Sequence, residues 1–102
     1  MKDILIEGHR ILTTDDVADA VLTYAQRLNQ AGSTDIVEFP SIDDGALSVC
    51  RMLLGSGIPV AVLDATTSLA SDIRGADRAC AEISRRTAAL ASGSSRSGRA
   101  LL

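Results

Sequence analysis

The sequence DIVEFPSIDDGALSVCRMLLGSGIPVAVLD, residues 35–64, decides the fold of this chain. It contains three runs rich in Val, Ile and Leu, residues that are typical of β-strands. These runs are residues 35–42, 46–54 and 58–64. Asp44–Gly45 separates the first two runs and Gly55–Ser56–Gly57 separates the last two. We therefore predict three successive strands, arranged as a meander with two short turns.

The Asp44–Gly45 pair indicates how the first two strands align. Asp-Gly between two apolar runs is a strong signal for a two-residue hairpin turn. A turn centred there places Glu38 opposite Arg51, which forms an ion pair across the strands. The same register places apolar residues opposite one another in three further pairs: Ile42–Leu47, Val37–Met52 and Ile36–Leu53. One choice of register thus satisfies four pairs and favours an antiparallel hairpin.

Residues 46–54 also fit a second interpretation. Their apolar residues recur at helical spacing: Ala46, Val49, Cys50, Leu53 and Leu54. Gly55 then stands where a helix would end. A helix here gives the order βαβαβα and a small doubly wound parallel sheet. Such a fold binds ligands beyond the carboxyl ends of its strands, near residues 40–45 and 64–67 of this chain.

The N-terminal segment predicts another hairpin. Gly8–His9 separates residues 4–7 from residues 10–13, and Gly at the first central position suits a type II′ turn. This register pairs charge with charge and apolar with apolar side chains: Glu7–Arg10, Ile6–Ile11 and Leu5–Leu12.

An amphipathic helix is expected over residues 14–31. Thr13 or Thr14 is a suitable N-cap, and Asp15 and Asp16 follow where carboxylates favour the positive end of a helix. Gly32 ends the helix. Its apolar stripe consists of residues spaced by three or four: Val17, Val21, Tyr24 and Leu28.

A second, longer helix is predicted from about Thr67 to Ala91. Its apolar positions alternate spacings of four and three: Leu69, Ile73, Ala76, Cys80, Ile83, Thr87 and Leu90. The remaining residues, 92–102, read SGSSRSGRALL and have too little apolar surface to form a core, so they predict a disordered tail.

Together these elements predict an α+β fold of order ββαβββα with an antiparallel or mixed sheet, a single domain over residues 1–91 and a tail over 92–102. Apolar residues alternate onto both faces of the predicted meander. Val37, Phe39, Cys50 and Met52 lie on one face, and Ile36, Val49 and Leu53 on the other. A sheet that is apolar on both sides must be covered on both sides. We expect the first helix on one face and the last helix, or a second copy in a homodimer, on the other.

Length and composition limit the class of protein. A chain of 102 residues is one domain by size, and no apolar run approaches the roughly 20 residues of a membrane helix. The N-terminus has no apolar signal region, so we expect a cytoplasmic location with reduced cysteines. Nine of the ten basic residues are Arg, which is typical of a GC-rich bacterial genome.

Candidate chemical groups are few, and each has a structural explanation. His9 is a turn residue without a partner nearby in sequence. The pairs Asp15–Asp16 and Asp43–Asp44 suit a helix start and a turn. Gly55–Ser56–Gly57 lacks the Lys that follows in a phosphate-binding loop. Cys50 and Cys80 lie in apolar patterns. The sequence therefore predicts no catalytic residue, no cofactor and no metal, and a protein that is not an enzyme.

The charges are distributed unevenly along the chain. Residues 1–72 hold eleven acids and four bases, whereas residues 73–102 hold two acids and six arginines. Arg74, Arg78 and Arg85 lie in one sector of the last predicted helix and are the candidate contact with a partner.

The leading interpretation is a non-catalytic module that binds another protein or assembles with itself. One alternative is a small α/β enzyme or ligand-binding domain, which requires a helix over residues 46–54. A second alternative is a nucleic-acid accessory protein that uses the arginines, although the net charge of −3 and the lack of stacking aromatic residues disfavour it.

Overall fold

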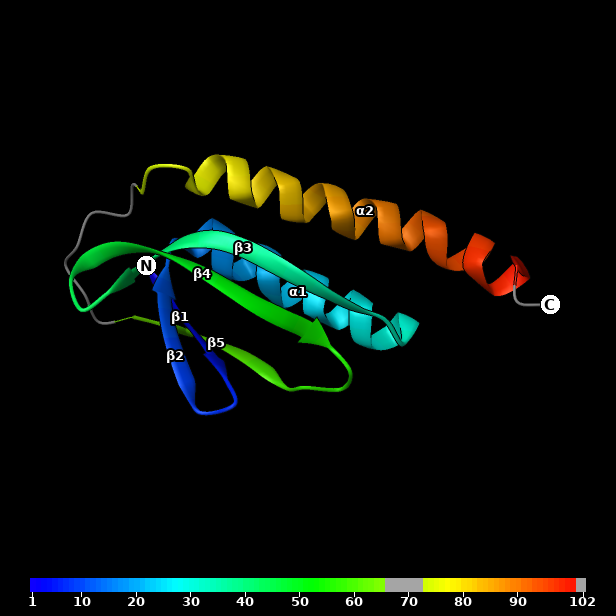
Figure 1. Cartoon of the computed structure of the whole chain (residues 1–102), viewed down its shortest axis with the longest axis horizontal. Coiled ribbons are helices and arrows are strands. Elements are labelled where there is room, and N and C mark those ends of the chain that lie inside the picture. The colour runs from blue at the N-terminus through cyan, green and yellow to red at the C-terminus, as the bar shows by residue number, and fades with distance from the viewer. Residues whose placement is uncertain (66–72, 101–102) are drawn as a thin grey trace.

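The computed structural model describes residues 1–65 and 73–100, with side chains up to residue 90 (Figure 1). The described residues form five strands: β1 (Lys2–Ile6), β2 (His9–Thr13), β3 (Thr34–Asp43), β4 (Ala46–Gly55) and β5 (Val60–Asp64). They also form two helices: α1 (Asp15–Ala31) and α2 (Ala76–Ala100). Every strand pairing is antiparallel. The predicted α+β class is confirmed, and the parallel sheet of the alternative interpretation is not formed.

The hairpin of β3 and β4 has the predicted register. Glu38 lies opposite Arg51, and the three apolar pairs form as expected. The turn residues Asp44 and Gly45 have φ angles of 52° and 79°, so both central positions require the left-handed conformation of a type I′ turn. Because β4 covers Ala46–Gly55, the helical interpretation of this segment is wrong.

The first hairpin forms with a different turn from the one predicted. Its central residues are Glu7 and Gly8, with φ angles of 47° and 83°, in place of Gly8–His9. Ile4 therefore lies opposite Ile11, and Leu5 lies opposite Arg10. This register places Ile4, which is fully buried, between Ile11 on β2 and Val62 on β5. Burial of this apolar row, which the pairing of Glu7 with Arg10 does not provide, accounts for the difference.

Strand β5 does not complete a meander. It pairs with β1 at the far side of the sheet, so the strand order is β4-β3-β2-β1-β5. Gly55, Ser56 and Gly57 all have positive φ angles and turn the chain away from β4. The Asn29 carboxamide oxygen at the end of α1 accepts a hydrogen bond from the Gly57 N–H at 2.8 Å. The edge position expected for the strand after Pro59 is confirmed.

Helix α1 begins and ends as its sequence predicts. The Thr14 hydroxyl accepts a hydrogen bond from the Val17 N–H at 3.2 Å, and Gly32 adopts φ 67° at the C-terminus. The predicted apolar stripe is buried against the sheet.

Helix α2 begins later and ends later than predicted. Ile73, Arg74 and Gly75 precede its first residue, Ala76. Part of the predicted start, residues 66–72 with Leu69, lies outside the described residues. The helix continues to Ala100. The side chains beyond residue 90 are not described, so the division into a domain of 1–91 and a tail of 92–102 remains a prediction.

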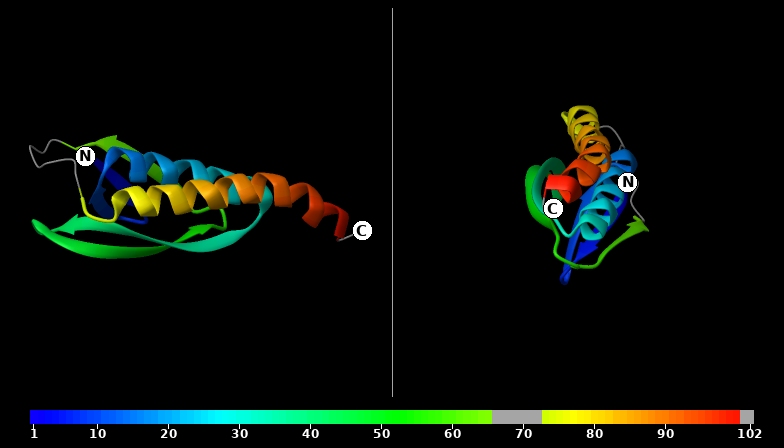
Figure 2. Two further views of the ribbon diagram at one scale, coloured as in Figure 1. Left: turned by 90° about the horizontal axis from the view of Figure 1, so that it is seen from above. Right: turned by 90° about the vertical axis from the view of Figure 1, so that its right-hand side faces the viewer.

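Both helices pack on the same face of the sheet. The sheet curves around α1 and α2, which lie side by side (Figure 2). Ile83 and Ala76 of α2 join the same buried core as Phe39 of β3 and Val21 of α1. The expectation that the last helix covers the second face is therefore wrong. Helix α1 is too narrow to cover five strands alone, and α2 completes that cover.

Candidate functional site

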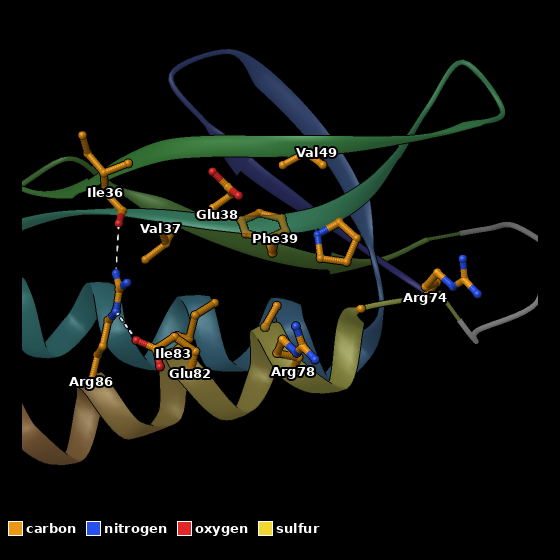
Figure 3. A pocket seen from close by; sticks show the side chains of 13 residues that line it. Ile36, Val37, Glu38, Phe39, Val49, Arg74, Arg78, Glu82, Ile83 and Arg86 are labelled. Carbon is orange, nitrogen blue, oxygen red and sulfur yellow. Dashed lines mark hydrogen bonds and ion pairs between the residues drawn. The ribbon is translucent and has the colours of Figure 1, made fainter.

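A groove of about 560 Å³ lies between β3 and α2 (Figure 3). The buried side chains of Val37, Phe39 and Ile83 form its floor. Ala79, on the first turns of α2, and Ile36, at the rim, add apolar surface. A groove of this size, mainly apolar with a few polar groups, has the volume of a typical ligand site.

Strand β3 presents an open edge to this groove. Along its whole length β3 pairs with β4, whereas it pairs with β2 only at Leu12–Ile42. Two carbonyl groups on the open edge have partners. The Ile36 oxygen accepts a hydrogen bond from Arg86 Nη1 at 3.1 Å, and the Pro40 oxygen accepts one from Thr13 Oγ1 at 2.9 Å. Pro40 has no N–H. Because main-chain groups of alternate residues point the same way along a strand, the N–H and C=O of Glu38 also face the groove.

A network of charged groups anchors α2 to the rest of the fold. The Tyr24 hydroxyl donates to Asp35 Oδ2 at 2.6 Å, and Arg86 Nη1 donates to the same oxygen at 3.1 Å. Arg86 Nε also donates to Glu82 Oε2 at 2.8 Å, and Arg85 donates to both oxygens of Glu82. The network therefore joins α1, β3 and α2.

The network shifts the ionisation of its acids. Burial raises the pKa of Asp35, but hydrogen bonds from Tyr24 and Ile36 and the charge of Arg86 outweigh it, and the pKa of Asp35 is lowered. Hydrogen bonds from Arg85 and Arg86 lower the pKa of Glu82 to about 2. Both carboxylates therefore remain ionised at neutral pH, which keeps Arg86 in place.

Tyr24 gives a direct test of this network. Burial, together with its hydrogen bond to Asp35, raises the pKa of Tyr24 to about 12 from its ordinary value of 10.0. We expect the folded protein to form phenolate near pH 12 and the urea-unfolded chain to form it near pH 10. Tyr24 is the single tyrosine and the chain has no Trp, so ultraviolet absorbance follows this group alone.

The direction of the effect on stability follows from the raised pKa. The folded state holds the Tyr24 proton more tightly than the unfolded state, so this contribution is fully present below pH 10 and is lost as the pH rises toward 12. The control is Asp35→Asn, which removes the neighbouring negative charge and should bring the pKa of Tyr24 part of the way back. Phenolate formation near pH 10 in the folded protein would contradict the network.

Two of the three predicted arginines line the groove. Arg74 and Arg78 lie on its rim, and within the described residues neither has a hydrogen bond or an ion pair. Arg85 does not line the groove, because it pairs with Glu82 at 2.6 Å. Arg86 takes its place. Sequence reasoning missed Arg86, although its spacing of three from the apolar position Ile83 was a usable signal.

The other sequence candidates lie apart from one another. His9 is exposed beside the first turn, and Asp43 and Asp44 are exposed at the tip of the β3–β4 hairpin. Asp15 pairs with the Met1 ammonium group at 3.0 Å. Gly55–Ser56–Gly57 forms the loop that leads toward β5. None of these residues lines the groove.

The two cysteines are free and half-buried. Burial raises the pKa of the Cys50 thiol, the opposite of what activates a nucleophile. Cys80 donates a hydrogen bond to the Asp16 carbonyl at 3.6 Å, which links α2 to α1. Both positions agree with a packing role.

The ligand site of the parallel-sheet alternative does not form in the described part of the chain. Its two segments, residues 40–45 and 64–67, do not adjoin, because β1 and β2 lie between β3 and β5. Residues 66 and 67 lie outside the described residues.

Two further classes of site were sought in residues 1–65 and 73–100. Among these residues, no three His, Cys, Asp or Glu side chains gather as a metal site would require. No described helix is long and apolar enough to cross a membrane.

The outer face of the β3–β4 hairpin is exposed and apolar. Its residues alternate with those of the buried face, and four of them form what we call the outer patch: Ile36, Leu47, Val49 and Leu53. Their exposed fractions are 60%, 58%, 59% and 47%. The Glu38–Arg51 ion pair lies among them. Single exposed apolar residues are ordinary, but a contiguous patch is typical of an interaction surface.

No protein-family model, curated protein or solved structure matches this chain. What can be said of its function therefore depends on the geometry of the groove and of the outer patch.

Proposed function

We propose that this chain is a non-catalytic binding module of the bacterial cytoplasm that forms a homodimer through its outer patch. The observation that carries the proposal is the exposure of four large apolar side chains on one face of one hairpin. Water contact with these side chains is unfavourable by about 25 cal/mol for each Å² of apolar surface, so a partner that covers them is stabilised.

The pattern of the outer patch is complementary to itself. Across the hairpin Ile36 lies opposite Leu53, Glu38 opposite Arg51 and Pro40 opposite Val49. A two-fold axis along the midline between β3 and β4 brings each residue of one copy over the cross-strand neighbour of that residue in the other copy. Apolar rows then meet apolar rows, and each Glu38 meets an Arg51. Two-fold dimers with such shared surfaces are the commonest oligomers.

Light scattering during size-exclusion chromatography tests this proposal. We expect the protein at about 100 µM to have twice the monomer mass of 10.6 kDa, and the variant Leu53→Lys to be monomeric because it places a charge in each half of the buried interface. Circular dichroism should show that Leu53→Lys is folded, since position 53 is 47% exposed.

Leu63→Lys is the matched control. Leu63 is also 47% exposed, but it lies on β5, three strands away from β3. We expect this variant to remain dimeric. A monomeric wild-type protein at this concentration would refute the proposal, and so would a loss of the dimer in both variants alike.

A further inference from the structure

The two arginines on the rim of the groove are available to an anion. Arg86 and Arg51, the other cations nearby, pair with Asp35, Glu82 and Glu38. Arg74 and Arg78 have no such partner in the described residues. Figure 3 shows both at the Phe39 end of the groove, away from Arg86. A guanidinium group binds a carboxylate through two parallel hydrogen bonds, so this end of the groove favours a carboxylate.

The edge of β3 offers main-chain hydrogen bonds at one position. The Ile36 N–H bonds to Asp35 Oδ1 at 2.8 Å, and the Ile36 and Pro40 carbonyls already have partners. Glu38 is left with an N–H donor and a C=O acceptor that face the groove. Such a pair matches one peptide group of an extended chain, as in the addition of a peptide to the edge of a sheet.

The same end of the groove is narrow. A methyl group placed on Gly75, just before α2, would lie 3.9 Å from Pro40 Cγ, which is van der Waals contact. An extended chain that runs along β3 toward Pro40 must therefore stop there. The distance along β3 from Ile36 to Pro40 is about 13 Å at 3.3 Å a residue, which gives room for roughly four residues.

We propose that this groove binds the carboxyl-terminal residues of a partner polypeptide. The terminal carboxylate lies on Arg78 and Arg74, one peptide group pairs with Glu38, and an apolar side chain packs on Ala79 at the groove wall. This site goes beyond the proposed self-association and does not depend on it, because Arg74 and Arg78 are not part of the outer patch.

Two synthetic pools of random hexapeptides test the site, one with free carboxyl termini and one with carboxamide termini. Each pool is passed over the immobilised full chain, and bound peptides are identified by mass spectrometry. We expect retention from the free-carboxyl pool with an apolar residue enriched near the terminus. Retention of the selected peptides should fall about tenfold when the carboxylate is replaced by carboxamide, since hydrogen bonds to charged groups are among the strong ones.

The matched variants are Arg78→Gln and Arg85→Gln, which remove the same charge from the same helix. Arg78→Gln should weaken binding of a selected peptide about tenfold, and Arg85→Gln should change it less than twofold because Arg85 does not line the groove. No enrichment, equal retention of both pools, or equal effects of the two variants would each overturn the proposal. The monomeric variant Leu53→Lys should still bind, so failure of this site and failure of the dimer are distinguishable.

Discussion

Replacing Gly55 with alanine should destabilise the fold by about 3 kcal/mol, the upper end of the cost of backbone strain. Gly55 has φ +103°, a conformation that residues with a Cβ rarely adopt. A Cβ at this position would lie 3.0 Å from Thr34 Cα and closer still to the Ser33 carbonyl oxygen. Both are backbone atoms of the neighbouring strand, so no side-chain rotation relieves the contact. Urea unfolding followed by circular dichroism measures the effect.

Gly45→Ala is the control for Gly55→Ala. Gly45 also has a positive φ, +79°, but no atom lies within 4 Å of a Cβ built there. Alanine at this turn should cost about 1 kcal/mol, the conformational term alone. Equal losses of stability in the two variants would show that the close approach of Ser33 and Thr34 contributes nothing.

Gly55 also marks where sequence reasoning reaches its limit. The sequence identifies Gly55–Ser56–Gly57 as a break between strands, and the break is there. The same signal fits a tight turn to a neighbouring strand and a crossing to the far edge of the sheet. The choice is made by residues distant in sequence, since Val60 and Val62 pair with Ile6 and Ile4 on β1.

The β3–β4 register was predictable because it depends on local information. The Asp44–Gly45 turn and the pairing of Glu38 with Arg51 lie within one hairpin, and both are found. The first hairpin has two candidate turns around Gly8 that differ by one residue. Either choice keeps each side chain on the same face of the sheet, so the alternation of apolar residues does not distinguish them.

The two apolar faces of the hairpin were also visible in the sequence, but not what covers them. Val37 and Met52 are buried and Leu53 and Val49 are exposed, as the alternation requires. That alternation carries no information on which side α2 packs. The side is set by Ile73, Ala76 and Ile83, which join the core formed by α1 and the inner face.

The candidate site was predicted in part for a related reason. Arg74 and Arg78 do line the groove, but the spacing that groups them with Arg85 assumes a regular helix from residue 67 onward. The helix begins at Ala76, and Glu82 holds Arg85 outside the groove. Arg86 enters it because Asp35 and the Ile36 carbonyl, on a strand fifty residues earlier, accept its hydrogen bonds.

Phe39→Ala should have the largest effect of any substitution considered, a loss of about 4 kcal/mol. Phe39 is 1% exposed, is the single phenylalanine of the chain and fills the space between β3 and α2. Its removal leaves a cavity that the backbone of the sheet and the helix cannot close. Domains of this size have total stabilities of about 5–15 kcal/mol, so the variant should be close to unfolding. Thermal unfolding, measured as a fall in Tm of about 20 °C, gives the result.

Two further variants make the result interpretable. Phe39→Leu keeps most of the buried volume and should remain measurable if the alanine variant is unfolded, with a loss between that of Phe39→Ala and zero. Ile36→Ala, on the outer face of the same strand, should change the stability by about 0.5 kcal/mol or less, since its side chain is already 60% exposed. These measurements belong in the monomeric Leu53→Lys protein, where dimer formation does not add to the stability of the outer face. If Ile36→Ala costs as much as Phe39→Ala there, the two faces of β3 are buried alike, and both the placement of α2 and the free outer patch are wrong.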